Sequence, residues 1–314
     1  MNSLKIVFMG TPDFAVQSLD ALISGNYNVE AVVTAPDKKS GRGKKINFSE
    51  IKKYSLKNNL KLLQPSNLKE IQFTNELKSI DADIFVVVAF RMLPKVVWEI
   101  PYKGTINLHA SLLPQLRGAA PIHWAIINGF KKTGLTTFFI DEKIDCGKII
   151  EQKEVKIEDF ENTGSLYNKL KKIGSLLLLS TIELISRDKF NTTKQSNSEN
   201  LMEAPKLNKT NTRIDWNKSG TKVFNLIRGL SPHPSAWTIS KRNGKIIKLF
   251  NVNYKKEKKK SVENGLIEIN DNLIKIYVND GYLEVNELQI EGKKIMNSTE
   301  FINGYKDFHL TKLI

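Results

Sequence analysis

Cysteine is almost absent from the sequence, with Cys146 alone among 314 residues. One cysteine cannot form an internal disulfide, and its rarity suits a reducing compartment. No apolar run approaches the roughly 20 residues of a membrane-spanning helix. The first residues show neither the basic start nor the long apolar core of a secretory signal. We therefore expect a cytoplasmic protein without a membrane-embedded part.

Histidine is also scarce, and none of the four lies with cysteine at the spacing of a zinc site, so no metal is predicted. His123 beside Trp124 is expected to be packed, and His233 and His309 to be structural or on the surface. A glycine turn at residues 10–13 follows the first apolar run but lacks the complete GxGxxG pattern. We therefore predict no dinucleotide cofactor.

Negative charge is in the minority, and the formal net charge is +15. Such a balance favours an acidic partner, with nucleic acid as the first candidate. A genome that favours Lys and Asn codons would produce a similar excess. The excess is concentrated, however: residues 207–314 hold 19 Lys and Arg against 11 Asp and Glu. This concentration makes nucleic acid more plausible than codon bias alone.

The chain changes character near residue 200. Before it, apolar runs such as Leu4–Met9 and Ala82–Ala89 alternate with helical patterns, as in an α/β domain with a mostly parallel buried sheet. Residues 191–200 contain no apolar side chain, which indicates a linker or exposed loop. Beyond residue 207, five short apolar runs separated by turn signals indicate a small β-barrel or sandwich. We predict domains at 1–190 and 207–314, joined by a linker at 191–206.

A basic loop follows the second expected strand. It places five cations within eight residues, namely Lys38, Lys39, Arg42, Lys44 and Lys45. Glycines on both sides of Arg42 let the loop adapt its shape, and cations spaced in this way suit phosphate contacts. A solvated surface loop explains the same composition equally well.

Asn107 and His109 end another expected strand, at residues 104–108. Residues two apart on a strand project to the same face, and ligands of open α/β sheets bind beyond the carboxyl ends of the strands. Asn107 therefore supplies a hydrogen-bond donor and His109 a general acid or base. The residues alone leave three loop carboxylates as partners: Asp141, Glu142 and Asp145. Cys146 is expected to be a passive loop thiol.

The segment at residues 106–114, its continuation at residues 117–122 and several motifs elsewhere in the chain resemble those of one family, the folate-dependent formyltransferases, and within it those of the enzymes acting on methionyl-tRNA. The central motif at residues 106–114 and its continuation at residues 117–122 carry the wider resemblance. Further matches cover nearly the whole chain: residues 8–16, the basic loop at 41–45, Arg213-Ile214-Asp215-Trp216 and Gly292-Lys293-Lys294. The resemblance implies a Rossmann-like domain of formyltransferase topology followed by an OB-like β-barrel that helps to hold tRNA.

The resemblance also implies a reaction and the residues that perform it. A formyl group would pass from 10-formyltetrahydrofolate to the α-amino group of methionyl initiator tRNA, without a metal. The family's catalytic residues fall on Asn107, His109 and Asp145. Asn107 and protonated His109 would stabilise the tetrahedral oxyanion, His109 would move the proton, and Asp145 would orient His109.

The same resemblance implies two sets of binding residues, one for folate and one for tRNA. The folate pocket is expected to comprise two strand-end segments and one loop start, namely Val88, Ala89, Phe90, Arg91, Met92, Leu93, Ser111, Leu112, Leu113, Pro114, Ile140 and Asp141. Contacts with tRNA are expected from cations of both domains, namely Lys38, Lys39, Arg42, Lys44, Lys45, Lys206, Lys209 and Arg213. The enzyme is expected to be a monomer.

Two other functions are weighed against this one. The first is a formyltransferase that acts on an amino sugar nucleotide or another small amine with the same three residues, without needing the basic loop. The second is a nucleic-acid-binding protein that has kept the fold and lost catalysis. The presence of Asn107, His109 and Asp145 together argues against this second function.

Overall fold

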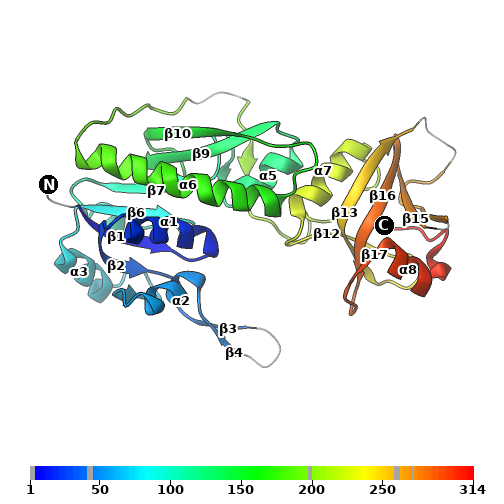
Figure 1. The fold of residues 1–314 in the computed structure, drawn as a ribbon, viewed down its shortest axis with the longest axis horizontal. Coiled ribbons are helices and arrows are strands. Elements are labelled where there is room, and N and C mark those ends of the chain that lie inside the picture. The colour runs from blue at the N-terminus through cyan, green and yellow to red at the C-terminus, as the bar shows by residue number, and fades with distance from the viewer. Residues whose placement is uncertain (1–3, 41–44, 197–199, 258–261, 271) are drawn as a thin grey trace. The chain divides into compact units, whose positions relative to one another are not determined.

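The computed structural model describes residues 4–40, 45–196, 200–257, 262–270 and 272–314. The chain divides into two compact units (Figure 1). The first comprises Met1–Gly118, Thr133–Val155 and Tyr167–Glu203, and the second comprises Ala119–Lys132, Lys156–Leu166 and Ala204–Ile314. The division differs from the expected boundaries, because two stretches before residue 190 pack in the second unit.

The first unit is built on a seven-stranded sheet with the order β10-β9-β7-β6-β1-β2-β5. Neighbours from β5 to β7 are parallel, and β9 runs antiparallel to β7. The strands are β1 (Lys5–Gly10), β2 (Asn28–Val33), β5 (Leu62–Leu63), β6 (Ile84–Val88), β7 (Thr105–His109), β9 (Lys132–Phe139) and β10 (Ile149–Lys156). The predicted α/β class with a mostly parallel sheet is confirmed.

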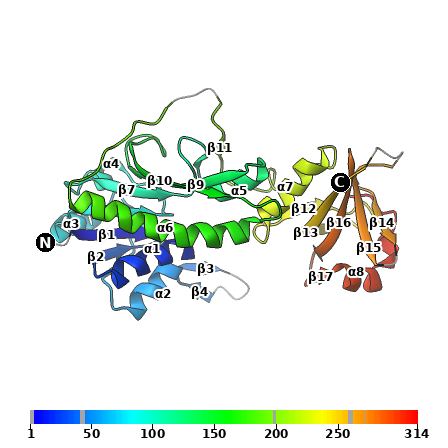
Figure 2. The same cartoon turned by 45° about the horizontal axis from the view of Figure 1, so that its top comes forward.

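Helices cover both faces of this sheet (Figure 2). On one face, α3 (Ile71–Ile80) and α4 (Lys95–Trp98) share an apolar core with odd-numbered strand residues such as Val7 and Val87. On the other face, α6 (Thr163–Ser186) packs so closely that a Cβ on Gly174 would lie 3.1 Å from Leu108. The described part of this unit also contains α1 (Asp13–Ser24) and α2 (Glu50–Lys57). Because apolar runs fill both faces, the sheet is buried as parallel sheets are.

The segment expected to be a basic loop begins and ends as a small hairpin. Its two strands, β3 (Lys38–Ser40) and β4 (Lys45–Asn47), pair antiparallel. Arg42 and Lys44 lie outside the described residues.

The second unit is built on an antiparallel sheet with the order β12-β13-β16-β15-β14, with β17 paired to β16. The C-terminal segment bonds to both edges of this sheet, through bridges from Leu313 to Ser240 and from Lys312 to Leu266. This connection fits the expected small β-barrel. The strands are β12 (Ala236–Ile239), β13 (Ile246–Lys256), β14 (Ile267–Asn270), β15 (Leu273–Val278), β16 (Gly281–Ile290) and β17 (Ile295–Asn297).

Helices complete the second unit, and one of them explains the division of the chain. Alongside α8 (Ser298–Gly304) and the short η1 (Lys306–Phe308), α7 (Gly220–Leu230) packs against α5 (Pro121–Ile127). A Cβ on Gly229 of α7 would lie 2.6 Å from Ile127, so only glycine permits this approach. The sequence places α5 among the residues of the expected catalytic domain, but its packing partner is α7.

Candidate active site

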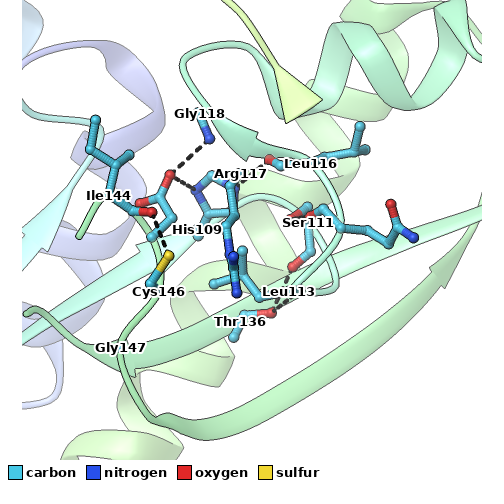
Figure 3. A network of polar contacts seen from close by, with 12 residues as sticks. His109, Ser111, Leu113, Leu116, Arg117, Gly118, Thr136, Ile144, Cys146 and Gly147 are labelled. Atoms are coloured by element: carbon cyan, nitrogen blue, oxygen red, sulfur yellow. Dashed lines mark hydrogen bonds and ion pairs between the residues drawn. The ribbon is translucent and has the colours of Figure 1, made fainter. Parts of the chain in front are cut away.

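His109 is the last residue of β7 and is buried, with 6% of its surface exposed. Its Nε2 atom lies 2.9 Å from the carbonyl oxygen of Leu116. Because a carbonyl only accepts, Nε2 carries a hydrogen and donates it. The other nitrogen, Nδ1, lies 3.7 Å from Oδ2 of Asp145 (Figure 3). The imidazole is therefore fixed between a backbone oxygen and a carboxylate.

Asp145 lies in a tight turn between β9 and β10 and has a positive φ of 52°. This left-handed backbone conformation is uncommon for residues other than Gly, Asn and Asp. The same Oδ2 that faces His109 accepts a hydrogen bond of 2.9 Å from the backbone N–H of Gly118. Gly147 follows, where a Cβ would lie 1.7 Å from the oxygen of Phe139, so this turn requires glycine. The backbone thus aims the Asp145 carboxylate at His109.

The other two candidate carboxylates have different partners. Asp141 accepts a hydrogen bond of 2.9 Å from the backbone N–H of Lys143, within its own loop. Glu142 pairs with Lys95 at 3.0 Å. Both carboxylates are exposed. Of the three candidates, Asp145 is the one whose carboxylate lies beside His109 in the described geometry.

Asn107 lies two residues before His109 on β7 and is half-buried. Its partners in register are Val87 on β6 and Phe138 on β9. Residues in register project to the same face of a sheet, so Asn107 shares the face of Val87. This is the face covered by α4, near the end of β6.

The loop after β7 is held by the hydroxyl of Thr136 on β9 (Figure 3). Thr136 Oγ1 donates to the carbonyl of Ser111 at 2.7 Å and accepts from the N–H of Leu113 at 3.1 Å. It accepts a further hydrogen bond from Gln152 Nε2 at 2.9 Å. The Ser111 hydroxyl in turn donates to the carbonyl of Gln115. All the hydrogen-bonding capacity of the Thr136 hydroxyl is therefore used to fix this loop.

Two glutamines contact the site in a way that the sequence did not predict. Gln152 on β10 bonds the carbonyl of Leu113 as well as Thr136. Gln195 lies in the segment expected to be a linker, yet it is buried and bonds the backbone around Asp145. Gln152 is one of several polar residues on its strand, and Gln195 is a single polar residue in an irregular segment, so no sequence signal identifies either contact.

The expected folate residues divide into accessible and enclosed groups. Met92 is 76% exposed, and Ala89 and Asp141 are also exposed. Val88, Leu93, Ser111 and Leu113 are buried. The intermediate positions are Phe90, Leu112, Pro114 and Ile140, and Phe90 and Ile140 pack against the core beside α4. Arg91 donates to the carbonyls of Ser66 and Pro65, which fixes its guanidinium.

Three of the expected tRNA-contacting cations gather on one turn of the second unit. Lys206, Lys209 and Arg213 are exposed, and Asn208 organises the turn by accepting from the N–H groups of Thr210 and Asn211. The Arg213 guanidinium lies 5.6 Å from the ring centre of Trp237. In the first unit, Lys38 is exposed, and Lys39 and Lys45 belong to β3 and β4.

Other residues with titratable or reactive side chains have hydrogen-bond partners within the protein. His123 bonds the carbonyl of His233, and burial lowers the pKa of its imidazole. The Cys146 thiol donates to the carbonyl of Ile144. Within the described residues, no group of His, Cys, Asp or Glu side chains is arranged to hold a metal ion. The helices formed by these residues include none that is long and apolar enough to cross a membrane.

Two family models match the chain. One, described as formyl transferase, matches residues 4–182, and another, described as formyl transferase, C-terminal domain, matches residues 206–306. Among known structures, the sugar 3N-formyl transferase WlaRD, determined in the presence of dTDP and 5-N-formyl-THF, aligns with a TM-score of 0.67 at 23% identity. The alignment covers 94% of this chain and 100% of that chain. HypX from Aquifex aeolicus in complex with tetrahydrofolic acid aligns at 0.64 and 18% identity, over 97% of this chain and 48% of that one. At these identities the likeness shows the fold.

Similar sequences give a finer assignment. The methionyl-tRNA formyltransferase of Flavobacterium johnsoniae is 51% identical over 306 residues, which are 97% of each chain. That of Bacteroides fragilis is 44% identical over 317 residues, covering 99% of this chain and 97% of the relative. Both domain models and both relatives agree with the resemblance in the sequence motifs: the chain belongs to the methionyl-tRNA formyltransferase family.

Proposed function

We propose that this protein transfers the formyl group of 10-formyltetrahydrofolate to the α-amino group of methionyl initiator tRNA. The near-complete coverage by methionyl-tRNA formyltransferases supports this substrate. The observation that carries the proposal within the site is the His109 and Asp145 pair at the carboxyl end of β7, at 3.7 Å. An imidazole held by a carboxylate at such a strand end suits proton transfer to and from a bound substrate.

The reaction requires a bond exchange at the formyl carbon. The amino nitrogen of methionine attacks this carbon, and the carbonyl oxygen becomes an oxyanion in a tetrahedral intermediate. Collapse of the intermediate breaks the bond between the carbon and the folate nitrogen. One proton leaves the amine and one reaches the folate nitrogen, so atoms and charge balance.

Three side chains take the catalytic roles in this proposal. Asn107 donates a hydrogen bond to the oxyanion, which such preorganised donors stabilise. His109, in its protonated form, adds a charged donor and passes the proton between the two nitrogens. Asp145 holds the charge of the imidazolium from the Nδ1 side. The expected folate contacts at residues 88–93, 111–114 and 140–141 complete the donor site.

A formylation assay tests this function. The enzyme is supplied with 10-formyltetrahydrofolate and with initiator methionyl-tRNA, free methionine or an amino sugar nucleotide as acceptor. We expect rapid formylation of the tRNA alone, and a loss of roughly 100- to 10,000-fold in kcat in His109→Ala with tRNA affinity retained. Preferred formylation of the amino sugar would replace the proposal with the small-amine alternative. Near-normal turnover of His109→Ala would refute the catalytic assignment.

A further inference from the structure

Gln195 is an isolated buried residue in a polar segment that follows α6. Only 7% of its surface is exposed, whereas its neighbours Lys194 and Ser196 are exposed. Burying a polar side chain costs free energy unless its hydrogen bonds are satisfied. The burial of the Gln195 amide therefore needs an explanation, which its hydrogen bonds supply.

Both ends of the Gln195 amide are fully engaged. Its Nε2 donates to the carbonyl oxygen of Asp145 at 2.9 Å and to that of Gly147 at 2.8 Å. Its Oε1 accepts from Nε of Arg117 at 3.1 Å and from Nη2 at 2.7 Å. Guanidinium groups only donate and carbonyls only accept, so the amide has one possible orientation.

These four bonds join the two segments that hold the Asp145 carboxylate. One segment is the turn of residues 145–147, where Asp145 has its positive φ of 52°. The other contains Arg117 and then Gly118, whose N–H bonds Oδ2 of Asp145. A change in either segment would move the carboxylate relative to His109. Gln195 fixes both segments at once, and none of these four bonds is to the imidazole.

We propose that Gln195 is a positioning residue that sets the Asp145 carboxylate at its distance from His109. The proposal rests on the proposed function, because it assumes that this pair moves the proton during formyl transfer. Without the amide, the turn is free to relax from its left-handed backbone, and the carboxylate loses its fixed direction. Misplacement on the scale of one ångström is costly for a catalytic group.

Two substitutions separate the hydrogen bonds from the shape of the side chain. Gln195→Met keeps the length of the side chain and removes all four hydrogen bonds. Gln195→Glu is nearly isosteric and still accepts from Arg117, but it cannot donate to the carbonyls of Asp145 and Gly147. Lys194→Met is the matched control, since it makes the same replacement at the adjacent exposed position.

Steady-state kinetics give the first readout. We expect both Gln195 variants to lower kcat by roughly 10- to 100-fold, with KM for the formyl donor and for tRNA within about twofold of wild type. Lys194→Met should keep wild-type values. Should Gln195→Met fail to fold, Gln195→Glu still decides, because it retains the shape and the contact with Arg117.

The second readout does not depend on activity. Nitrogen chemical shifts of the His109 imidazole, measured at one pH on ¹⁵N-histidine-labelled protein, report the position of the carboxylate. We expect these shifts to change in both Gln195 variants and to stay constant in Lys194→Met. A wild-type kcat or an unchanged His109 signal in folded Gln195→Glu would overturn the proposal. Absence of tRNA formylation by the wild-type enzyme would instead refute the proposed function, while the imidazole shifts would still test the placement of Asp145.

Discussion

Oδ2 of Asp145 lies between two nitrogen atoms: it accepts a hydrogen bond of 2.9 Å from the backbone N–H of Gly118, and Nδ1 of His109 lies 3.7 Å away. The opposite nitrogen of the imidazole, Nε2, already donates to Leu116. Each nitrogen of the imidazole therefore faces an oxygen, Nε2 a backbone carbonyl and Nδ1 a carboxylate.

Asp145→Asn tests this relationship directly. The amide can still accept from Gly118, but it is neutral and does not stabilise a charged imidazole. We expect kcat for tRNA formylation to fall roughly 100-fold or more, with KM for both substrates changed little. Glu142→Gln, an exposed loop carboxylate paired with Lys95, is the control and should retain normal kcat. Comparable kcat in the two variants would contradict the role of Asp145.

The cationic turn of the second unit gives a prediction about tRNA affinity. Each phosphate contact releases counterions, so removing contacts flattens the dependence of the logarithm of affinity on the logarithm of salt concentration. Replacing Lys206, Lys209 and Arg213 by Gln should weaken binding and reduce this slope by about 0.7 to 0.9 for each lost contact. The slope is measured by titrating labelled tRNA at several salt concentrations.

Lys241 and Lys245 provide the control for this measurement. Both are exposed, in the turn between β12 and β13, and they lie outside the expected tRNA set. Their replacement by Gln removes positive charge from the same unit, and we expect it to change the slope less than the triple variant does. An equal change would show that only total charge matters and that the turn at 206–213 makes no particular contact.

The sequence predicted the strand end that carries Asn107 and His109, but not the backbone conformation that positions Asp145 beside it. Buried parallel strands are continuous apolar runs, so Ile84–Val88 was predicted at residues 82–89. The side chains of Asn107 and His109 followed from the spacing of a strand. The preference for Asp145 over two other carboxylates depends on a positive φ and on the N–H of Gly118. Such tertiary features leave no periodic pattern, and the family resemblance was needed to select Asp145.

The division of the chain into two units likewise depends on tertiary contacts that leave no pattern in the sequence. Residues 191–206 were expected to be a linker because they are polar, yet Thr193 exchanges backbone hydrogen bonds with Ile149 and Gln195 is buried. The α5 helix was expected to belong with the strands around it in sequence, but its apolar face packs on α7. A hydrophobic pattern shows that a helix has a buried face without showing which element covers that face.

The start of α1 gives a prediction about stability and pH. Burial alone raises the pKa of the Asp13 carboxyl, but hydrogen bonds from Lys171 and Tyr167 and the charge of Lys171 outweigh it and bring the pKa below 3.8. A lowered pKa means that the pair stabilises the folded state above pH 3.8, and that this contribution is lost as the pH falls through the folded pKa.

Lys171→Met should therefore lower the free energy of unfolding near neutral pH. The loss should be below about 1 kcal/mol, because the Asp13 side chain is half exposed. Urea unfolding at pH 6 and at pH 3 should show a smaller difference from wild type at the lower pH. Lys172→Met, at an exposed neighbouring position on α6, should show little loss at either pH. A difference for Lys171→Met that is constant with pH would contradict the ionic explanation.

Thr133 and Thr136 on β9 form a matched pair for a final prediction. Both are buried, at 2% and 0% exposed, and both would be replaced by Val of similar shape. The Thr136 hydroxyl makes three hydrogen bonds, to Ser111, Leu113 and Gln152, whereas the Thr133 hydroxyl is buried without a hydrogen-bond partner. Their valine variants should therefore differ in the free energy of unfolding.

Thr136→Val leaves the carbonyl of Ser111 and the N–H of Leu113 without their partner. We expect it to lower the free energy of unfolding by about 1 to 3 kcal/mol, and to reduce formyl transfer because the loop at 111–114 is expected to hold folate. Thr133→Val removes an unsatisfied buried hydroxyl and should leave stability unchanged or raise it. Urea unfolding followed by circular dichroism measures both changes. Equal destabilisation would show that the loop is held by packing on β9 rather than by the hydroxyl of Thr136.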